Sequence, residues 1–510
     1  MATPSWLYIS QLTGNSGTTR ITVSADTNYN FYSLITDVFV ETDNTGLQGD
    51  TVIVQKASGD SSDSYANDYL TFQILSDGYI NWKTKENGLP ESISYSKNGS
   101  SWNLYIPAKG DNHIPVSRGD ILKIKNYYFK YGGMTNYNTF SGSTAKFNLC
   151  GNIMSMVYED NFSGVTSLPA STSGYNFDHL FEGCTGLTNA NNLVLPVTTT
   201  KNYSYAYLFN GCTNLKRPPT LPATNLGKGC YQGMFEGCTN LIKPPIISAT
   251  TLADNCYKEM FAGCTSLVVA PELPVTTLAA SCYSYMFSGC TSLTTAPTLP
   301  ATTLGGSCYS NMFRNCTSLT TAPELPSNTL VSICYEEMFA GCTSLVVAPE
   351  LPAQTIEMKS YYGMFSGCTS LTTAPSTLGD TFHTGGFTEA KVNYGCESMF
   401  EGCTSLVSAP ALPALTLGEY CYRRMFWGCT SLKRAPELPA TSLAGGCYNA
   451  MFYKCTNLNY IKCLSTTVDS KFQNWVYQVQ TNSGTFVKKA GVTWPRGYSG
   501  IPNNWTVQEV

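Results

Sequence analysis

The side chains with the most scope for chemistry in this 510-residue chain are its 21 cysteines. Eleven stand three residues after a recurring phenylalanine, and eight more stand four or five residues before one. Regularly spaced thiols could bind metal ions, carry redox chemistry or form disulfides. The chain has no C-x-x-C pair and only three histidines, so we expect no metal site and no cofactor.

The second set of cysteines argues against disulfides. In three copies Asn176, Ser204 or Ser360 replaces the cysteine before the phenylalanine, while the cysteine after it remains. A disulfide would not tolerate the loss of one half alone. We therefore expect free thiols that fill the core as small, nearly apolar side chains.

Other groups that could support catalysis are sparse. His113, His179 and His383 are far apart, and no G-x-S-x-G, H-E-x-x-H, P-loop or G-x-G-x-x-G motif stands in a convincing context. Glutamates, among them Glu324 and Glu350, recur eleven residues after the phenylalanine. Stacked carboxylates repel each other unless they are solvated or share a cation, and we favour a solvated face. We expect no enzymatic activity.

These residues belong to a repeat. The sequence MFSGCTSLTTAPTLP at 286–300 recurs with little change in eleven copies, whose phenylalanines run from Phe181 to Phe452. Most steps are 26 residues, the first is 28, and one of 35 contains an insertion at 379–395. Periods of this length are typical of a solenoid, in which each unit buries its apolar face on its neighbours.

Within a unit, Leu278, Cys282 and Met286 follow at four-residue intervals, which predicts a short helix of about three turns. The glycine after the phenylalanine would end this helix in a left-handed conformation. A brief strand at 293–296 should follow, because the later prolines cannot donate to a ladder. The predicted buried ladder comprises Phe235, Phe261, Phe287, Phe313, Phe339, Cys238, Cys264, Cys290, Cys316 and Cys342.

A column of tyrosines stands four residues before the phenylalanines, as at Tyr283. These rings could form a strip on which sugars stack, or they could pack at the edge of the helix with a solvated hydroxyl. We favour packing.

The unit is similar to the A-F-x-x-C-x-x-L-x-x-I-x-I-P repeat of the BspA-like leucine-rich repeat proteins, found on gut Bacteroidetes and other surface-active microbes. The resemblance covers about 161–458 and rests on the spacing of Phe, Cys and Leu. It implies an α/β leucine-rich-repeat solenoid and a role in adhesion or recognition.

Alternating apolar and polar residues predict β-structure at both ends. Residues 1–56 resemble a BACON domain, a small β-sandwich associated with carbohydrate or mucin binding in gut Bacteroidetes and their phages. We expect a linker at 57–64, a second β-sandwich module at 65–150, the solenoid with its N-terminal cap at 151–458 and a β-rich cap at 459–510. The expected fold is thus multidomain: all-β sandwich modules, then about eleven 26-residue repeats, then a cap.

Positions that vary between copies are not needed for the fold and could bind a ligand. One set follows the phenylalanine by seven and eight residues, beside the predicted strand, and the inserted loop is another candidate. An aromatic and basic cluster with Tyr453 lies on the predicted helix side, although ordinary surface is the simpler interpretation. The candidate ligand-binding residues are Thr294, Thr295, Thr320, Thr321, Glu324, Glu350, Arg423, Arg424, Trp427, Lys433 and Arg434.

Composition removes other classes of function. The formal charge of −4 gives no electrostatic basis for binding nucleic acid. No apolar run approaches the ~18 residues of a membrane span. The start, MATPSWLYIS, lacks the pattern of a signal peptide, so we expect a trimmed signal or another route out of the cell.

The preferred hypothesis is a non-enzymatic fibre or decoration protein of a phage virion that adheres to host-surface or mucus glycans. The alternative is an extracellular adhesin on a bacterial cell surface, with its signal peptide removed. The expected partners are glycans or a host surface receptor, and other virion proteins that hold the N-terminal modules. A homo-oligomer is left open.

Overall fold

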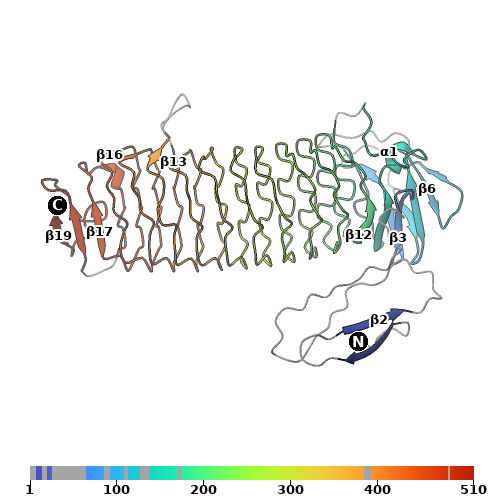
Figure 1. Cartoon of the computed structure of the whole chain (residues 1–510), viewed down its shortest axis with the longest axis horizontal. Helices are drawn as coiled ribbons and strands as arrows, with labels where there is room; N and C mark the ends of the chain where they lie inside the picture. The colour runs from blue at the N-terminus through green and yellow to red at the C-terminus, as the bar shows by residue number, and fades with distance from the viewer. Residues whose placement is uncertain are drawn as a thin grey trace. The chain divides into compact units, whose positions relative to one another are not determined.

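The computed structural model describes residues 7–13, 20–25, 65–84, 92–107, 113–126, 137–170, 174–383, 393–479 and 483–510. The chain divides into two compact units, Met1–Ser64 and Tyr65–Val510. In the first unit, β1 (Leu7–Thr13) pairs antiparallel with β2 (Arg20–Ala25) (Figure 1). The rest of the predicted BACON-like domain, and the predicted linker, lie outside the described residues.

The second unit begins with a six-stranded sheet in the order β12 (Leu187–Val194), β11 (Phe147–Asn152), β3 (Leu70–Ile74), β9 (Ile121–Lys125), β6 (Ile93–Lys97) and β7 (Asn103–Tyr105). Two small sheets pair β4 (Gly78–Asn81) with β8 (His113–Val116) and β5 (Lys83–Thr84) with β10 (Asn138–Thr139).

The sheet continues directly into the repeats. Strand β11 is antiparallel to β3 on one side and parallel to β12 of the first coil on the other. The boundary expected after residue 150 therefore falls inside β11, and the module shares one hydrophobic core with the coils. The sheet covers the apolar end of the solenoid that would otherwise be exposed.

From residue 174 the chain winds through stacked coils (Figure 1). The predicted helix in each coil is wrong. The only α-helix among the described residues is α1 (Ser155–Tyr158), which lies before the coils. The segment expected to be helical is a series of tight turns, in which Met286 N donates to Tyr283 O of the same coil at 3.1 Å. The amides that alternate with these donate to carbonyl groups of the next coil, as Phe287 N does to Met312 O at 2.9 Å.

The four-residue spacing that predicted a helix comes from these turns. The backbone takes a positive φ at every fourth residue: 52° at Ser281, 56° at Tyr285 and 74° at Gly289. A positive φ at the third position is typical of type II turns. Turns repeated every four residues bury Cys282 and Met286 on one side, as two helical turns would, so spacing alone could not separate the two conformations.

The predicted strand at 293–296 is reduced to single bridges. Thr295 pairs with Val269 on one side and Thr321 on the other, in parallel. A second line of bridges, such as Thr277 with Thr303, lengthens into two-residue strands only late in the array. These late strands are β13 (Thr355–Ile356), β14 (Thr381–Phe382), β15 (Thr416–Leu417) and β16 (Ser442–Leu443). The architecture is repeat-rich and largely extended, with almost no helix in the described residues.

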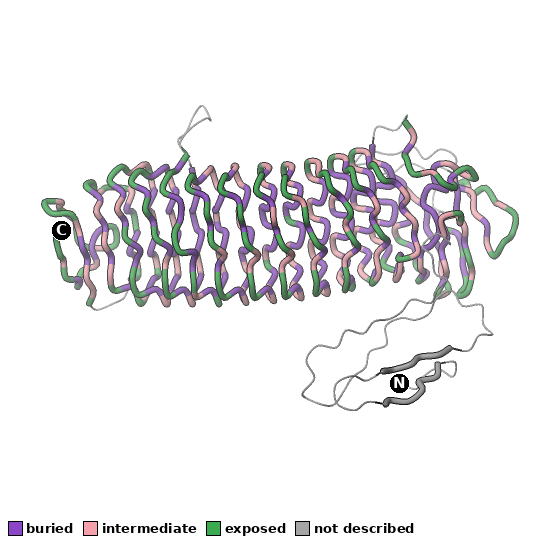
Figure 2. The backbone as a smooth tube through the Cα atoms, in the orientation of Figure 1, coloured by how far each residue is buried: buried purple, intermediate pink, exposed green. Residues whose placement is uncertain are grey.

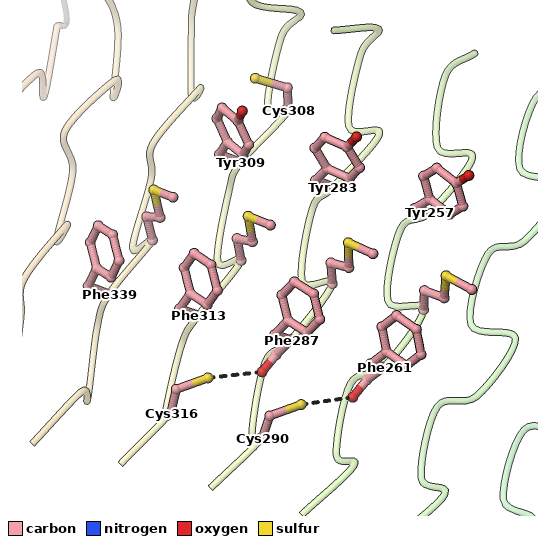
Figure 3. Packing of buried hydrophobic residues seen from close by; sticks show 14 of the residues in the cluster. Tyr257, Phe261, Tyr283, Phe287, Cys290, Cys308, Tyr309, Phe313, Cys316 and Phe339 are labelled. Carbon is pink, nitrogen blue, oxygen red and sulfur yellow. Dashed lines mark hydrogen bonds between the residues drawn. The ribbon is translucent and has the colours of Figure 1, made fainter. Parts of the chain in front are cut away.

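Buried positions recur in every coil along the stack (Figure 2). Their side chains form ladders in which the same residue repeats from coil to coil (Figure 3). The ring of Phe287 stacks between those of Phe261 and Phe313, with 5.6 Å between centroids on each side. The Cys290 thiol donates to Phe261 O at 3.1 Å. Each phenylalanine and cysteine predicted for the ladder is fully buried.

All 21 cysteines lie buried and unpaired. Burial raises the pKa of Cys230 and of Cys282 to about 12 in each case, because a thiolate is poorly solvated there. The thiols are therefore kept protonated and shielded from reagents in solution.

The tyrosine column packs, as favoured, and does not form a strip on which sugars stack, but it does not lie at a helix edge with a solvated hydroxyl. The rings of Tyr231 and Tyr257 are 1% exposed and stack on each other at 5.8 Å, so no sugar can reach them. The hydroxyl groups of Tyr231 and Tyr335 are also shielded, with no protein partner among the described residues. The predicted helix edge is wrong because the column points into the coil. Cys396 takes this position in its own coil.

The last coil is covered by a cap. Three parallel strands, β17 (Tyr460–Cys463), β18 (Thr485–Lys488) and β19 (Thr506–Glu509), continue the stack. Trp475 follows η2 (Ser470–Phe472), lies 6.0 Å from the ring of Phe452 and donates its indole N–H to Gly500 O at 2.8 Å. An aromatic cluster thus closes the phenylalanine ladder.

Candidate functional site

The first candidate surface is the strand stripe, the two residues that follow each phenylalanine by seven and eight. Thr294, Thr295, Thr320 and Thr321 are all exposed there. Both residues of each pair face solvent because the bridges hold only one residue per coil. Valine replaces threonine in neighbouring coils, and the central part of the stripe carries no charged side chain.

The glutamates beside this stripe are solvated or paired. Glu350 accepts hydrogen bonds from Ser376 N at 3.0 Å and Ser376 Oγ at 2.7 Å in the next coil, and Glu324 is exposed. Among the described residues, no group of three or more His, Cys, Asp or Glu side chains is placed to hold a metal ion.

The second candidate surface is the C-terminal turn surface, formed by Arg423, Arg424, Trp427, Tyr453 and Tyr477. Trp427 and Tyr453 occupy the same position in successive coils, so their rings stack with centroids 4.0 Å apart. Tyr477 continues the row at 4.8 Å from Tyr453. The Arg424 guanidinium lies 4.3 Å from the Trp427 ring centre. These distances suit cation–π and stacking contacts.

Stacking limits what this row can bind. Tyr453 has a ring against each face, Trp427 on one side and Tyr477 on the other, so a sugar cannot lie flat on it. The row offers ring edges, hydroxyl groups and a guanidinium instead. Such a surface suits polar or anionic groups better than the apolar face of a sugar.

A family-model comparison matches the BspA type leucine rich repeat region in six copies, over residues 123–294 and 254–378. Together the two ranges cover half of the chain. The chain belongs to the BspA-type leucine-rich repeat family. A search for individual curated relatives gave no significant match. Membership of the BspA-type family suggests a surface or adhesion-type binding protein. The matched ranges begin at residue 123, so the BACON-like character of residues 1–56 stays a prediction.

No helix among the residues described for this BspA-type protein has the length and apolar character needed to cross a bilayer. Among the described residues, the backbone hydrogen bonds that join neighbouring coils run between tight turns and at short β-bridges.

One buried carboxylate supports the C-terminal turn surface. Glu397 is 5% exposed and pairs with Arg423 at 3.5 Å. Burial raises the pKa of Glu397, while the positive charges of Arg423, Arg424 and Lys359 oppose that rise. Glu401 also lies near this carboxylate, and Lys359 pairs with Glu336 at 3.8 Å. Arg424 is therefore the cation of this cluster that forms no ion pair with a carboxylate among the described residues.

The C-terminal part of the chain has an excess of basic residues. Residues 419–510 contain ten Lys or Arg and only four Asp or Glu. Three of those acids pair with lysine, as Glu437 does with Lys462 at 2.7 Å. Lys433 and Arg434 belong to the strand stripe of the same coil, where Arg434 lies 3.8 Å from the Tyr460 ring centre. The predicted basic residues therefore divide between two faces of one coil.

Sequence reasoning missed a matching cluster at the other end of the BspA-type array. The His179 ring stacks between Tyr137 at 4.0 Å and Tyr207 at 4.8 Å. Asp178 lies 3.4 Å from His179 Nδ1. Burial raises the pKa of Asp178 to about 6, and His179 opposes that rise. The repeat period could have placed His179 beside Tyr207, since both stand two residues before a phenylalanine.

The inserted loop at 379–395 is only partly described. His383 Nδ1 lies 2.8 Å from a Glu357 carboxylate oxygen of the preceding coil. Residues 384–392 lie outside the described residues, so the loop stays a prediction as a binding element.

Proposed function

We propose that this BspA-type repeat protein is a non-catalytic adhesion protein that binds acidic glycans at its C-terminal turn surface. The observation that carries this proposal is the contact of Arg424 with the stacked row of Trp427 and Tyr453. The ring holds the guanidinium from one side, which leaves its N–H groups available to a ligand. Guanidinium groups bind carboxylate and sulfate oxygens in pairs.

The charge distribution supports an acidic ligand. The ten basic residues of 419–510 outnumber the four acidic ones, although the whole chain has a formal charge of −4. An electropositive end on an otherwise acidic protein would attract sulfated or sialylated chains from a distance.

We also propose that the protein is displayed on a virion, as a fibre or decoration protein of a tailed phage that infects gut Bacteroidetes. The BACON-like resemblance of residues 1–56 supports this location, and these N-terminal modules would attach the protein to other virion proteins. A bacterial cell-surface adhesin is the second candidate, which membership of the BspA-type family favours. Immunogold electron microscopy separates them, because label on purified virions supports the first and label on cells the second.

A glycan array with the full chain tests the binding function. Sulfated and sialylated glycans should give the strongest signals, and added salt should weaken them, because the proposed contacts are charged. Binding to neutral glycans alone, or binding that salt does not change, would contradict the proposal. Incubation with mucin glycans should release no sugar if the protein is not an enzyme.

A further inference from the structure

Strand β7 forms an open edge of the six-stranded sheet, where it pairs with β6 and Leu104 lies opposite Ser94. On its other side β6 pairs with β9: Asn98 N donates to Ile121 O at 2.9 Å, and Ser94 lies opposite Lys125. Hydrogen bonding alternates along an antiparallel strand, so Asn98 and Ser94, which are four residues apart, both direct their backbone groups to β9. Ser94 therefore offers no backbone partner to Leu104, whose own N–H and C=O point to the open edge.

The side chains on one face of this edge are apolar. Leu104 is 63% exposed, Ile106 is 70% exposed, and Trp102 is partly buried. Side chains two residues apart lie on the same face of a strand, so the three form one row. The row is held at one end, because the Trp102 ring lies 4.8 Å from that of Tyr69 and 4.7 Å from Lys125 Nζ.

Two other strands at sheet edges carry residues that oppose pairing with another chain. Strand β8 has Pro115 opposite Tyr79 of β4, and Tyr79 O accepts from Thr144 N at 3.0 Å instead of bonding β8. The Pro115 position therefore faces the open side, where a proline cannot donate a hydrogen bond. Strand β19 carries Glu509, which pairs with Lys488. Prolines and charged side chains are common protections of edge strands.

Strand β7 has neither protection. No charged residue occurs in 98–108, the segment that contains it. Pro107 stands three residues after Leu104, so its position faces β6 and removes no donor from the open edge. An uncharged edge with exposed aliphatic side chains is a template for pairing with another strand.

We infer that the edge pairs with the same edge of a second copy of this chain, as two antiparallel β7 strands related by a two-fold axis at Leu104. This axis places Leu104 of one copy opposite Leu104 of the other, and the two exchange their N–H···O bonds. Trp102 of each copy then lies opposite Ile106 of the other. Every member of the row meets an apolar partner and no like charges face each other, which is the self-complementarity that a two-fold interface requires.

The pairing would join the two six-stranded sheets into one and cover both edges. The exposed apolar area of one row is small beside the about 800 Å² per partner that a stable interface buries, so we expect dissociation in the micromolar range. The dimer would carry two C-terminal turn surfaces. This inference goes beyond the proposed adhesion function and does not depend on which ligand the coils bind.

Sedimentation equilibrium of the full chain tests the pairing. The native chain should show a monomer–dimer equilibrium. Leu104→Lys and Leu104→Asp each place two like charges against each other at the axis, so each should raise the dissociation constant about tenfold or more. Leu104 is exposed, so thermal unfolding of the monomer should be unchanged. Ile246→Lys is the matched control, because Ile246 is an aliphatic residue 74% exposed on a coil, and this variant should keep the dimer.

An equal mixture of Leu104→Lys and Leu104→Asp tests the two-fold register. The axis sets position 104 against itself, so only a mixed pair places a lysine opposite an aspartate, and dimers should return in the mixture and weaken as salt is added. Amide hydrogen exchange gives an independent readout. The Leu104 amide should be protected in the native dimer and exchange freely in Leu104→Lys, whereas the Asn103 and Tyr105 amides, which face β6, should be protected in both.

A native chain that stays monomeric at high micromolar concentration would overturn the inference, and so would a dimer that persists in both Leu104 variants. A mixture of the two variants that stays monomeric would also overturn it, because the strands would then not meet at Leu104. A chain that dimerises in this way but ignores acidic glycans on the array loses only the proposed function of the C-terminal turn surface.

Discussion

Near its two ends the array of coils has a buried carboxylate at the same position of the repeat, but the neighbouring side chains differ. Asp178 and Glu397 each stand three residues before a phenylalanine, and both are at least 95% buried. Asp178 lies beside His179 within a stack of tyrosines, whereas Glu397 pairs with Arg423 and lies near two further cations. The same column of the repeat thus holds, near each end of the array, a carboxylate whose pKa is raised by burial, and different charged groups surround the two.

The outward columns extend this contrast. Near the N-terminal end, Glu236 and Glu259 lie close to Tyr207, and Tyr207 donates to Glu259 at 3.4 Å. Near the C-terminal end, Arg424 and Trp427 occupy columns that hold glutamate there. The inward ladders are nearly identical throughout. Binding specificity therefore depends on a few outward positions, and the same coil could present residues that bind either a positively or a negatively charged ligand.

The largest expected effect is on the shared scaffold. Phe287→Ala should lower the free energy of unfolding by about 3–5 kcal/mol, because it empties a place in a close-packed ladder. The ring contacts Phe261 and Phe313 equally, so protection of amides from hydrogen exchange should fall on both sides of the coil.

The control is Thr295→Ala on the outer surface of the same coil, which should change stability by no more than about 0.5 kcal/mol. A Phe287→Ala variant that loses protection on only one side would show that the two ends do not share one scaffold. Urea unfolding and hydrogen exchange together make the measurement.

The next effect is the pH dependence of stability that a buried carboxylate causes. The pKa of Asp178 is about 6 in the folded protein, raised by burial from 3.8. The folded state therefore binds the proton more tightly, and stability should fall as pH rises from about 4 to about 6. The loss is at most about 3 kcal/mol. Asp178→Asn should abolish this loss and be the more stable form at pH 7.

Thermal unfolding of both forms between pH 4 and pH 7 tests the sign. Parallel curves for the native chain and Asp178→Asn would contradict the effect of burial. Glu397→Gln is the companion variant, because the pKa of Glu397 is also raised by burial while three cations oppose the rise.

A smaller effect concerns ligand binding at the two ends. Arg424→Gln should weaken binding to sulfated glycans about tenfold and reduce its dependence on salt, because one charged contact is lost. Arg423 is left in place since it pairs with Glu397. Glu259→Gln changes the same column near the other end and should not weaken binding. Equal losses in the two variants would remove the distinction between the ends.

The repeat period and the inward phenylalanines could be predicted from sequence because they depend on strict recurrence. A side chain kept in every coil, such as that of Phe287, must meet the same environment each time. The period also places Trp427 next to Tyr453, since the two stand 26 residues apart. These inferences need no knowledge of the backbone conformation.

The conformation of the coil could not be predicted in this way. Helical turns and the four-residue turns at Ser281, Tyr285 and Gly289 bury the same residues, so the pattern of Cys282 and Met286 fits both. The direction in which the tyrosine side chains point depends on that conformation, so it could not be predicted either.

The smallest expected effect tests whether glycans bind at the C-terminal turn surface or at the strand stripe. Thr320→Val with Thr321→Val keeps the branched shape and removes two exposed hydroxyl groups. The next coil already has Val346 and Val347 at these positions, so the stability should change by no more than about 0.5 kcal/mol. Glycan binding should also stay unchanged, because the proposed acidic-glycan site lies on another face. A clear loss of array signal would move the main binding surface from the C-terminal turn surface to the strand stripe, where the threonine hydroxyls would then be the contacts.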